Sequence, residues 1–76
     1  MNLKVIMFGK LADIAGNTVT VNDVADTDGL ISSLNKTYPG LVGIKYMIAV
    51  NKQVVNSNTP LKEDQVIVLL PAFSGG

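Results

Sequence analysis

The chain has 76 residues, of which 47% are hydrophobic and 16% are charged, so it is long enough for one small domain and too apolar for a disordered segment. Six lysines balance six acidic residues and arginine is absent, which argues against a nucleic-acid-binding surface. Cysteine and histidine are also absent, which excludes disulfides, thiol nucleophiles, imidazole bases and the usual zinc ligands. Autonomous catalysis is therefore not expected.

The same composition bears on where the protein works. A small stable domain without disulfides fits a reducing cytoplasm better than secretion. The longest apolar run, residues 66–73, is far shorter than the about 20 residues that a membrane-spanning helix needs, and the N-terminal apolar run is too short for a signal peptide. We therefore expect a cytoplasmic protein whose partners include neither nucleic acid nor membrane.

The first segment, residues 3–8, reads as a central strand. Leu3, Val5 and Met7 would share one wholly apolar face, while Ile6 and Phe8 make the far end of the other face apolar. Residues 11–15 can form one helical turn, and residues 18–21 alternate Thr and Val as a half-buried second strand. The short connection predicts an antiparallel pair.

An amphipathic helix follows an Asp-rich turn. Thr27 is predicted to cap this helix and Asp28 to lie in its positive first turn. Pro39 and Gly40 end it, because proline disfavours helical geometry in the preceding residue. The apolar stripe of the helix consists of Leu30, Ile31, Leu34 and Tyr38.

The remaining elements complete an α+β domain. Residues 46–50 and 53–55 read as two short strands around Asn51 and Lys52, and residues 67–70 form the last and most apolar strand. If the first and last strands pair in parallel at the centre of the sheet, their dense aliphatic runs are explained. The right-handed crossover rule then favours a β-grasp: a mixed four- to five-stranded sheet with one main helix on one face.

Residues 1–71 therefore form the predicted domain, and residues 72–76 a flexible C-terminal tail that ends on two glycines. Five extended residues reach about 17 Å, far enough to enter a partner's active site. The tail presents one reactive group, a terminal carboxylate that another enzyme would have to activate, since the chain has no phosphate-binding loop motif. The alternative is that the two glycines are frayed chain.

Two other features suggest chemistry only at first sight. Asp23, Asp26 and Asp28 place three carboxylates in six residues, but their spacing does not match a calcium-binding loop, so turn formation and helix capping explain them and no metal site is predicted. Ser74 has no base beside it in the sequence that could make it a nucleophile.

Several motifs along the whole chain carry a family resemblance. They are residues 3–9 (LKVIMFG) with Leu11, Tyr38-Pro39-Gly40, Ala49-Val50-Asn51, Thr59-Pro60-Leu61, and the ending LLPAFSGG at residues 69–76. Together they resemble the MoaD/ThiS family of ubiquitin-like sulfur carriers, and within it the molybdopterin-synthase branch.

The resemblance implies a sulfur carrier that binds no cofactor and is not an enzyme by itself. An adenylating enzyme of the ubiquitin-activating type (MoeB-like) would use ATP to adenylate Gly76, which is then converted to a thiocarboxylate. Ser74 and Gly75 belong to the tail that enters the large catalytic subunit of molybdopterin synthase (MoaE-like). There the sulfur would pass to a cyclic pterin phosphate in molybdenum cofactor biosynthesis.

The resemblance also implies a docking face for the partner. It assigns partner binding to Phe8, Val54 and Leu70, with Phe73 anchoring the root of the tail. The alternative is that Phe8 and Leu70 are ordinary core residues, because the parity of the strands is not readable from the sequence.

The sequence departs from the family pattern at a few positions. Pro71-Ala72 stands where two prolines are common, Ala12-Asp13 where an Arg-Glu pair is common, and Lys52 where a glycine is common in the turn. Three other functions stay open: a ThiS-like donor for thiazole synthesis, a ubiquitin-like modifier joined to lysines through Gly76, and an interaction domain with an inert tail.

Overall fold

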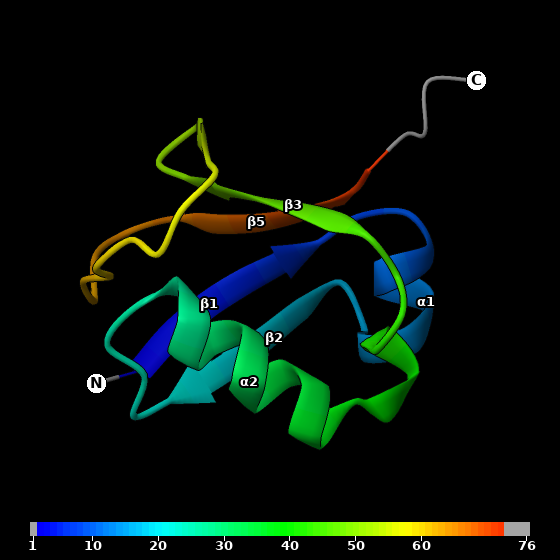
Figure 1. Ribbon diagram of the computed structural model, residues 1–76. Helices are drawn as coiled ribbons and strands as arrows, with labels where there is room; N and C mark the ends of the chain where they lie inside the picture. Colours follow the sequence, from blue (N-terminus) through cyan, green and yellow to red (C-terminus); the bar gives the residue numbers. More distant parts are fainter. Residues whose placement is uncertain (1, 73–76) are drawn as a thin grey trace.

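The computed structural model of the protein describes residues 2–72, which form one mixed sheet with a helix against it (Figure 1). The elements are β1 (Asn2–Met7), α1 (Lys10–Ala15), β2 (Thr18–Asn22), α2 (Thr27–Thr37), the 3-10 turn η1 (Pro39–Leu41), β3 (Tyr46–Val50), β4 (Gln53–Val55) and β5 (Ile67–Pro71). All the predicted elements are present, and their bounds differ from the predicted ones by at most about one residue, as is usual at element ends.

The sheet has the strand order β2-β1-β5-β3-β4, with β1 and β5 at its centre. These two strands pair in parallel, Val5 opposite Ile67, whereas the other pairs are antiparallel. Figure 1 shows β1 and β5 running side by side in the same direction. This is the β-grasp predicted from the sequence.

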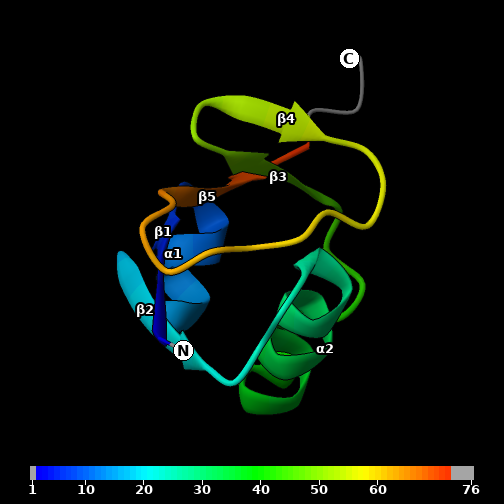
Figure 2. The same ribbon diagram turned by 90° about the vertical axis from the view of Figure 1, so that its left-hand side faces the viewer.

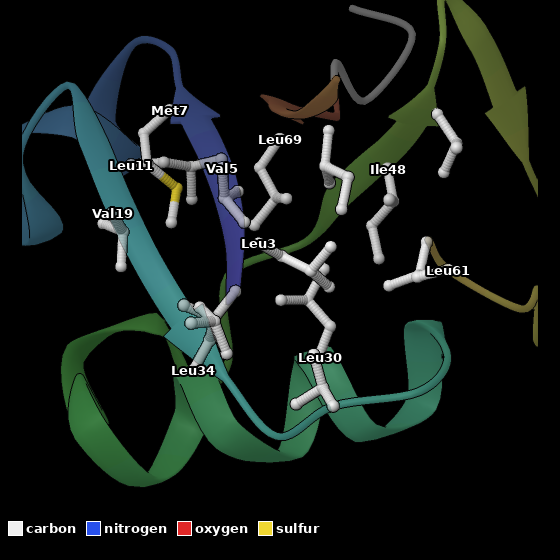
Figure 3. Packing of buried hydrophobic residues seen from close by; sticks show 14 of the residues in the cluster. Leu3, Val5, Met7, Leu11, Val19, Leu30, Leu34, Ile48, Leu61 and Leu69 are labelled. Carbon is white, nitrogen blue, oxygen red and sulfur yellow. The ribbon is translucent and has the colours of Figure 1, made fainter. Parts of the chain in front are cut away.

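One face of the sheet packs against α2 and forms the core. Leu3 and Val5 of β1 and Leu69 of β5 are completely buried on this face, and they meet Leu30 and Leu34 of α2 (Figure 3). Figure 2 shows the sheet curving around the helix. The strict alternation of β1 therefore uses one set of side chains for stability and leaves the other set on the opposite face.

The start of α2 differs from the prediction in its capping residue. The cap is Asp26, whose Oδ1 accepts a hydrogen bond from the Gly29 N–H at 2.9 Å. The prediction of Thr27 as the cap is wrong because the Thr27 hydroxyl is buried and accepts a hydrogen bond from the Thr59 N–H at 2.9 Å. Bonds from the Gly29 N–H and the Asn58 amide hold the pKa of Asp26 below its ordinary value.

These contacts tie the loop before β5 to the start of α2. Besides its bond to the Thr59 N–H, the Thr27 hydroxyl donates to Asn58 Oδ1 at 3.3 Å, and that same oxygen accepts from the Asp28 N–H at 2.9 Å. The Thr27 N–H in turn donates to the Thr59 carbonyl at 2.9 Å. A loop without regular structure is thereby fixed by hydrogen bonds to a helix terminus.

Thr27→Val tests this connection. The substitution keeps the shape of a side chain that is 3% exposed but leaves the Thr59 N–H without its acceptor. We expect the free energy of unfolding to fall by about 1–3 kcal/mol, measured by chemical denaturation. Thr27→Ser, which keeps the hydroxyl, should avoid most of that loss. Equal stability of Thr27→Val and the unmodified protein would contradict the assignment.

The turn between β3 and β4 carries backbone strain. Asn51 and Lys52 have φ angles of 50° and 72°, the geometry of a two-residue type I′ hairpin turn. The Asn51 side chain also accepts a hydrogen bond from the Val66 N–H at 3.0 Å, so Asn51 has a structural use. Lys52 has the same left-handed backbone conformation, which glycine adopts without a steric penalty.

We expect Lys52→Gly to stabilise the protein by up to about 1 kcal/mol, because the relief of left-handed strain exceeds the added entropy of the unfolded chain. Thermal and chemical unfolding measure the change. Lys52→Ala is the matched control, since it removes the charge but keeps the Cβ atom, and it should give no gain. A gain of equal size in both variants would assign the effect to the lysine side chain instead.

Candidate docking face and tail root

The face of the sheet opposite α2 is apolar across its three central strands. Cross-strand pairs on this face include Ile6 with Val68 and Met47 with Leu70. The polar side chains on this face include Lys4 of β1 and Thr18 and Thr20 of β2, all of which are exposed. The apolar residues, called the outer face below, are Ile6, Phe8, Met47, Ala49, Val54, Val68 and Leu70.

Phe8 and Leu70 lie together at one end of the outer face. Together with Met47, both line a hollow of about 480 Å³. The Phe8 N–H donates to the Leu69 carbonyl at 3.1 Å, which fixes Phe8 beside the end of β5. Phe8 is 48% exposed and Leu70 is half-buried, so neither is part of the buried core.

Besides the three residues already named, the hollow is lined by Gly9, Lys10 and Pro71. Its walls are mainly apolar side chains with one ammonium group from Lys10. Such a surface suits an apolar side chain of another protein, with an acidic group beside it.

Val54 lies on the same face but does not line the hollow. It is 49% exposed on β4, where it pairs with Ala49 of β3. Sequence reasoning missed Met47, which is 36% exposed and faces Leu70 across the strands. All five residues of β3 are apolar or aromatic, so the strand has no polar alternation that would have shown which side chains point outward.

The end of β5 is held closely against the end of β1. Gly9 has a φ of +59°, and a Cβ atom there would lie 2.9 Å from Pro71 Cγ, so only glycine fits this contact without a shift of the proline. The Ala72 N–H donates to the Lys45 carbonyl at 3.0 Å. The described chain therefore ends at a defined point beside the hollow.

The predicted tail residues Phe73, Ser74, Gly75 and Gly76 lie outside the described residues. Within residues 2–72, no group of three or more His, Cys, Asp or Glu side chains could hold a metal ion. No helix in that range is both long and apolar enough to cross a membrane. Of the three clustered aspartates, Asp26 serves as the helix cap, in line with the capping interpretation.

Glutamate substitutions distinguish outer-face residues from core residues. We expect Phe8→Glu and Leu70→Glu to keep a cooperative thermal transition, with a loss of about 1 kcal/mol for half-buried Leu70. Leu69→Glu is the matched control, because it would bury a carboxylate at a completely buried position and should abolish cooperative folding. Circular dichroism measures all three. Loss of cooperative melting in Leu70→Glu would place Leu70 in the core.

Comparisons with known proteins agree with this fold. The sequence model of the ThiS family matches residues 5–76. Among solved structures, a chain in the complex of subunits 1 and 2 of molybdopterin-converting factor from Helicobacter pylori 26695 is 31% identical, with a TM-score of 0.70 and 100% of both chains covered.

Two further structures share the fold. One is SAMP1 from Haloferax volcanii, which is 20% identical with a TM-score of 0.81 and 100% of both chains covered. The other is the small archaeal modifier protein 1 from Methanosarcina acetivorans, which is 24% identical with a TM-score of 0.79, covering 99% of this chain and 96% of that chain. A search of curated proteins gave no match.

Proposed function

The chain belongs to the ThiS family, whose members are small non-catalytic sulfur carriers, and on this premise we propose that it is the sulfur-carrier subunit of a molybdopterin synthase. The observation that carries the proposal is its 31% identity, over the full length of both chains, to a chain in the complex of the two molybdopterin-converting factor subunits. The apolar outer face beside the root of the tail supports it, since a carrier needs a surface for docking.

The chemistry proposed for the tail follows from its terminal carboxylate. A carboxylate is anionic at neutral pH and a poor electrophile, so a MoeB-like adenylating enzyme first joins it to AMP at the expense of ATP. Sulfur at the oxidation level of hydrosulfide then attacks the acyl adenylate and displaces AMP, which leaves a thiocarboxylate on Gly76. The thiocarboxylate sulfur is a good nucleophile that attacks a carbon of the cyclic pterin phosphate and displaces an oxygen there. Water then cleaves the acyl–sulfur bond, so the sulfur stays on the pterin and the carboxylate returns for another cycle.

The outer face is the proposed docking surface for a MoaE-like large subunit. Phe8 and Leu70 line the hollow that would accept an apolar side chain of the partner, and Val54 extends the contact toward β4. Residues 72–76 are the proposed tail on the domain of residues 1–71, with Phe73 anchoring its root. Extended, they reach about 17 Å from the edge of the outer face.

Phe8→Glu tests the docking surface. A buried aromatic anchor replaced by a charge commonly costs about 2 kcal/mol or more of binding energy, so we expect affinity for the large subunit to fall by about 30-fold or more. Titration calorimetry with the large subunit of the same organism measures it. Ser32→Glu, which adds the same charge on the exposed side of α2, is the matched control. Unchanged binding of Phe8→Glu would remove the outer face from the proposal.

The intact mass of the protein purified from its native cells tests sulfur carriage directly. We expect a fraction in which one terminal oxygen is replaced by sulfur, and we expect deletion of Gly76 to abolish this species. Ser74→Ala is the control that should retain it, because no step uses the hydroxyl. Unmodified protein while the pathway is active would favour an interaction domain, and Gly76 in isopeptide linkage would favour a protein modifier.

A sulfur donor for thiazole synthesis is the second candidate, because the matching family model is that of ThiS itself. Both carriers would form the same thiocarboxylate and would differ only in the acceptor. The protein in its thiocarboxylate form, mixed with the large subunit and a cyclic pterin phosphate, should lose its sulfur under the favoured proposal. Retention of the sulfur in that mixture would favour the thiazole pathway.

A further inference from the structure

A second depression, called the helix-side groove below, lies on the opposite face of the sheet from the docking surface. Its volume is about 510 Å³, and α2, the segment that follows η1, the start of β3 and Ala72 all contribute to it. An apolar cavity of roughly 150 Å³ is already large enough to bind benzene. The residues that carry the argument are Ile31, Asn35, Ile44, Tyr46 and Ala72.

The groove holds polar atoms that have no partner among the described residues. Asn35 Oδ1 and the Tyr46 hydroxyl are both buried and make no hydrogen bond there. A buried polar group without a partner costs about 1–3 kcal/mol. Burial also raises the pKa of Tyr46 above its ordinary value, and a tyrosine hydroxyl is a hydrogen-bond donor at neutral pH in any case. Most of the residues that line the groove are nevertheless apolar or aromatic, so it suits an occupant with a large apolar side chain.

The register of the sheet leads the chain into this groove. The last β3–β5 pair is Tyr46 with Pro71, and the Ala72 N–H bonds to the Lys45 carbonyl at 3.0 Å. One more step of the same antiparallel ladder would bring Phe73 opposite Ile44. Side chains two residues apart on a strand share a face, so Phe73 would lie on the side of Ile44 and Tyr46, which line the groove.

We infer that the helix-side groove binds the protein's own Phe73 while the carrier is free. Among residues 73–76 only Phe73 has a large apolar side chain, and it directly follows a residue that lines the groove. A tethered segment competes at an effective concentration in the millimolar range or above, which favours it over a second copy of the chain.

This contact gives the tail a resting position on the helix side, whereas the proposed docking surface is on the outer face. A partner that takes up the extended tail must first draw Phe73 out of the groove. Docking of Phe73 in the free protein does not depend on what the tail carries. Its displacement by a partner rests on the proposed function.

Nuclear magnetic resonance of the full chain tests the inference. The chain has two phenylalanines, so labelling of that residue type allows the Phe73 ring to be assigned. We expect nuclear Overhauser effects from the Phe73 ring to the methyl groups of Ile31 and Ile44. In Phe73→Ala these methyl signals should lose their ring-current shift, while the amide spectrum of the domain stays native. Ser74→Ala is the matched control and should leave the methyl signals in place.

Absence of these effects, together with unchanged methyl signals in Phe73→Ala, would overturn the inference. Nuclear Overhauser effects that appear only between labelled and unlabelled copies in a mixed sample would also overturn the inference, because Phe73 of a second copy would then occupy the groove. The intact-mass measurement separates the two proposals. If the protein shows the Phe73 contacts but never carries sulfur, the inference about the groove is supported and the proposed function is contradicted.

Discussion

The parallel pairing of β1 with β5 is the constraint on which the rest of the structure depends. It joins the first strand of the chain to the last, with Val5 opposite Ile67, and places both at the centre of the sheet. Because the strands run in the same direction, the end of β1 at Phe8 meets the end of β5 at the root of the tail. The candidate docking hollow is a direct product of that meeting.

The two faces of the sheet differ in role: the face against α2 stabilises the fold, and the outer face is the candidate recognition surface. A domain of 76 residues has few apolar side chains to spare, and burial against α2 uses Leu3, Val5 and Leu69 completely. Ile6 of β1 and Val68 and Leu70 of β5 alternate with these buried residues, and they are apolar although α2 does not cover them. An exposed apolar face on a small protein is a feature of proteins that bind others, and here it adjoins Pro71 at the end of β5.

Individual hydrogen bonds and one close contact fix the segments that lie outside the helices and strands. The loop before β5 is tied to α2 through the Thr27 hydroxyl and Asn58, and the β3–β4 turn is joined to the same loop region by Asn51 and Val66. At the end of β1, Gly9 allows Pro71 to approach closely. The hydrogen bonds of the loop fix the approach to β5, and the contact between Gly9 and Pro71 fixes its end.

The sequence by itself determined the elements, their order and the β-grasp, because the period of two in β1 and the helical stripe on α2 are local properties of the chain. It also pointed to Phe8 and Leu70 through a family resemblance. The prediction of Thr27 as the helix cap failed, since its hydroxyl bonds to Thr59, 32 residues away. Only the tertiary structure decided that Met47 joins the outer face and that Asn35 and Tyr46 share a groove with Ala72, because uniformly apolar strands and contacts between distant segments leave no local pattern in the sequence.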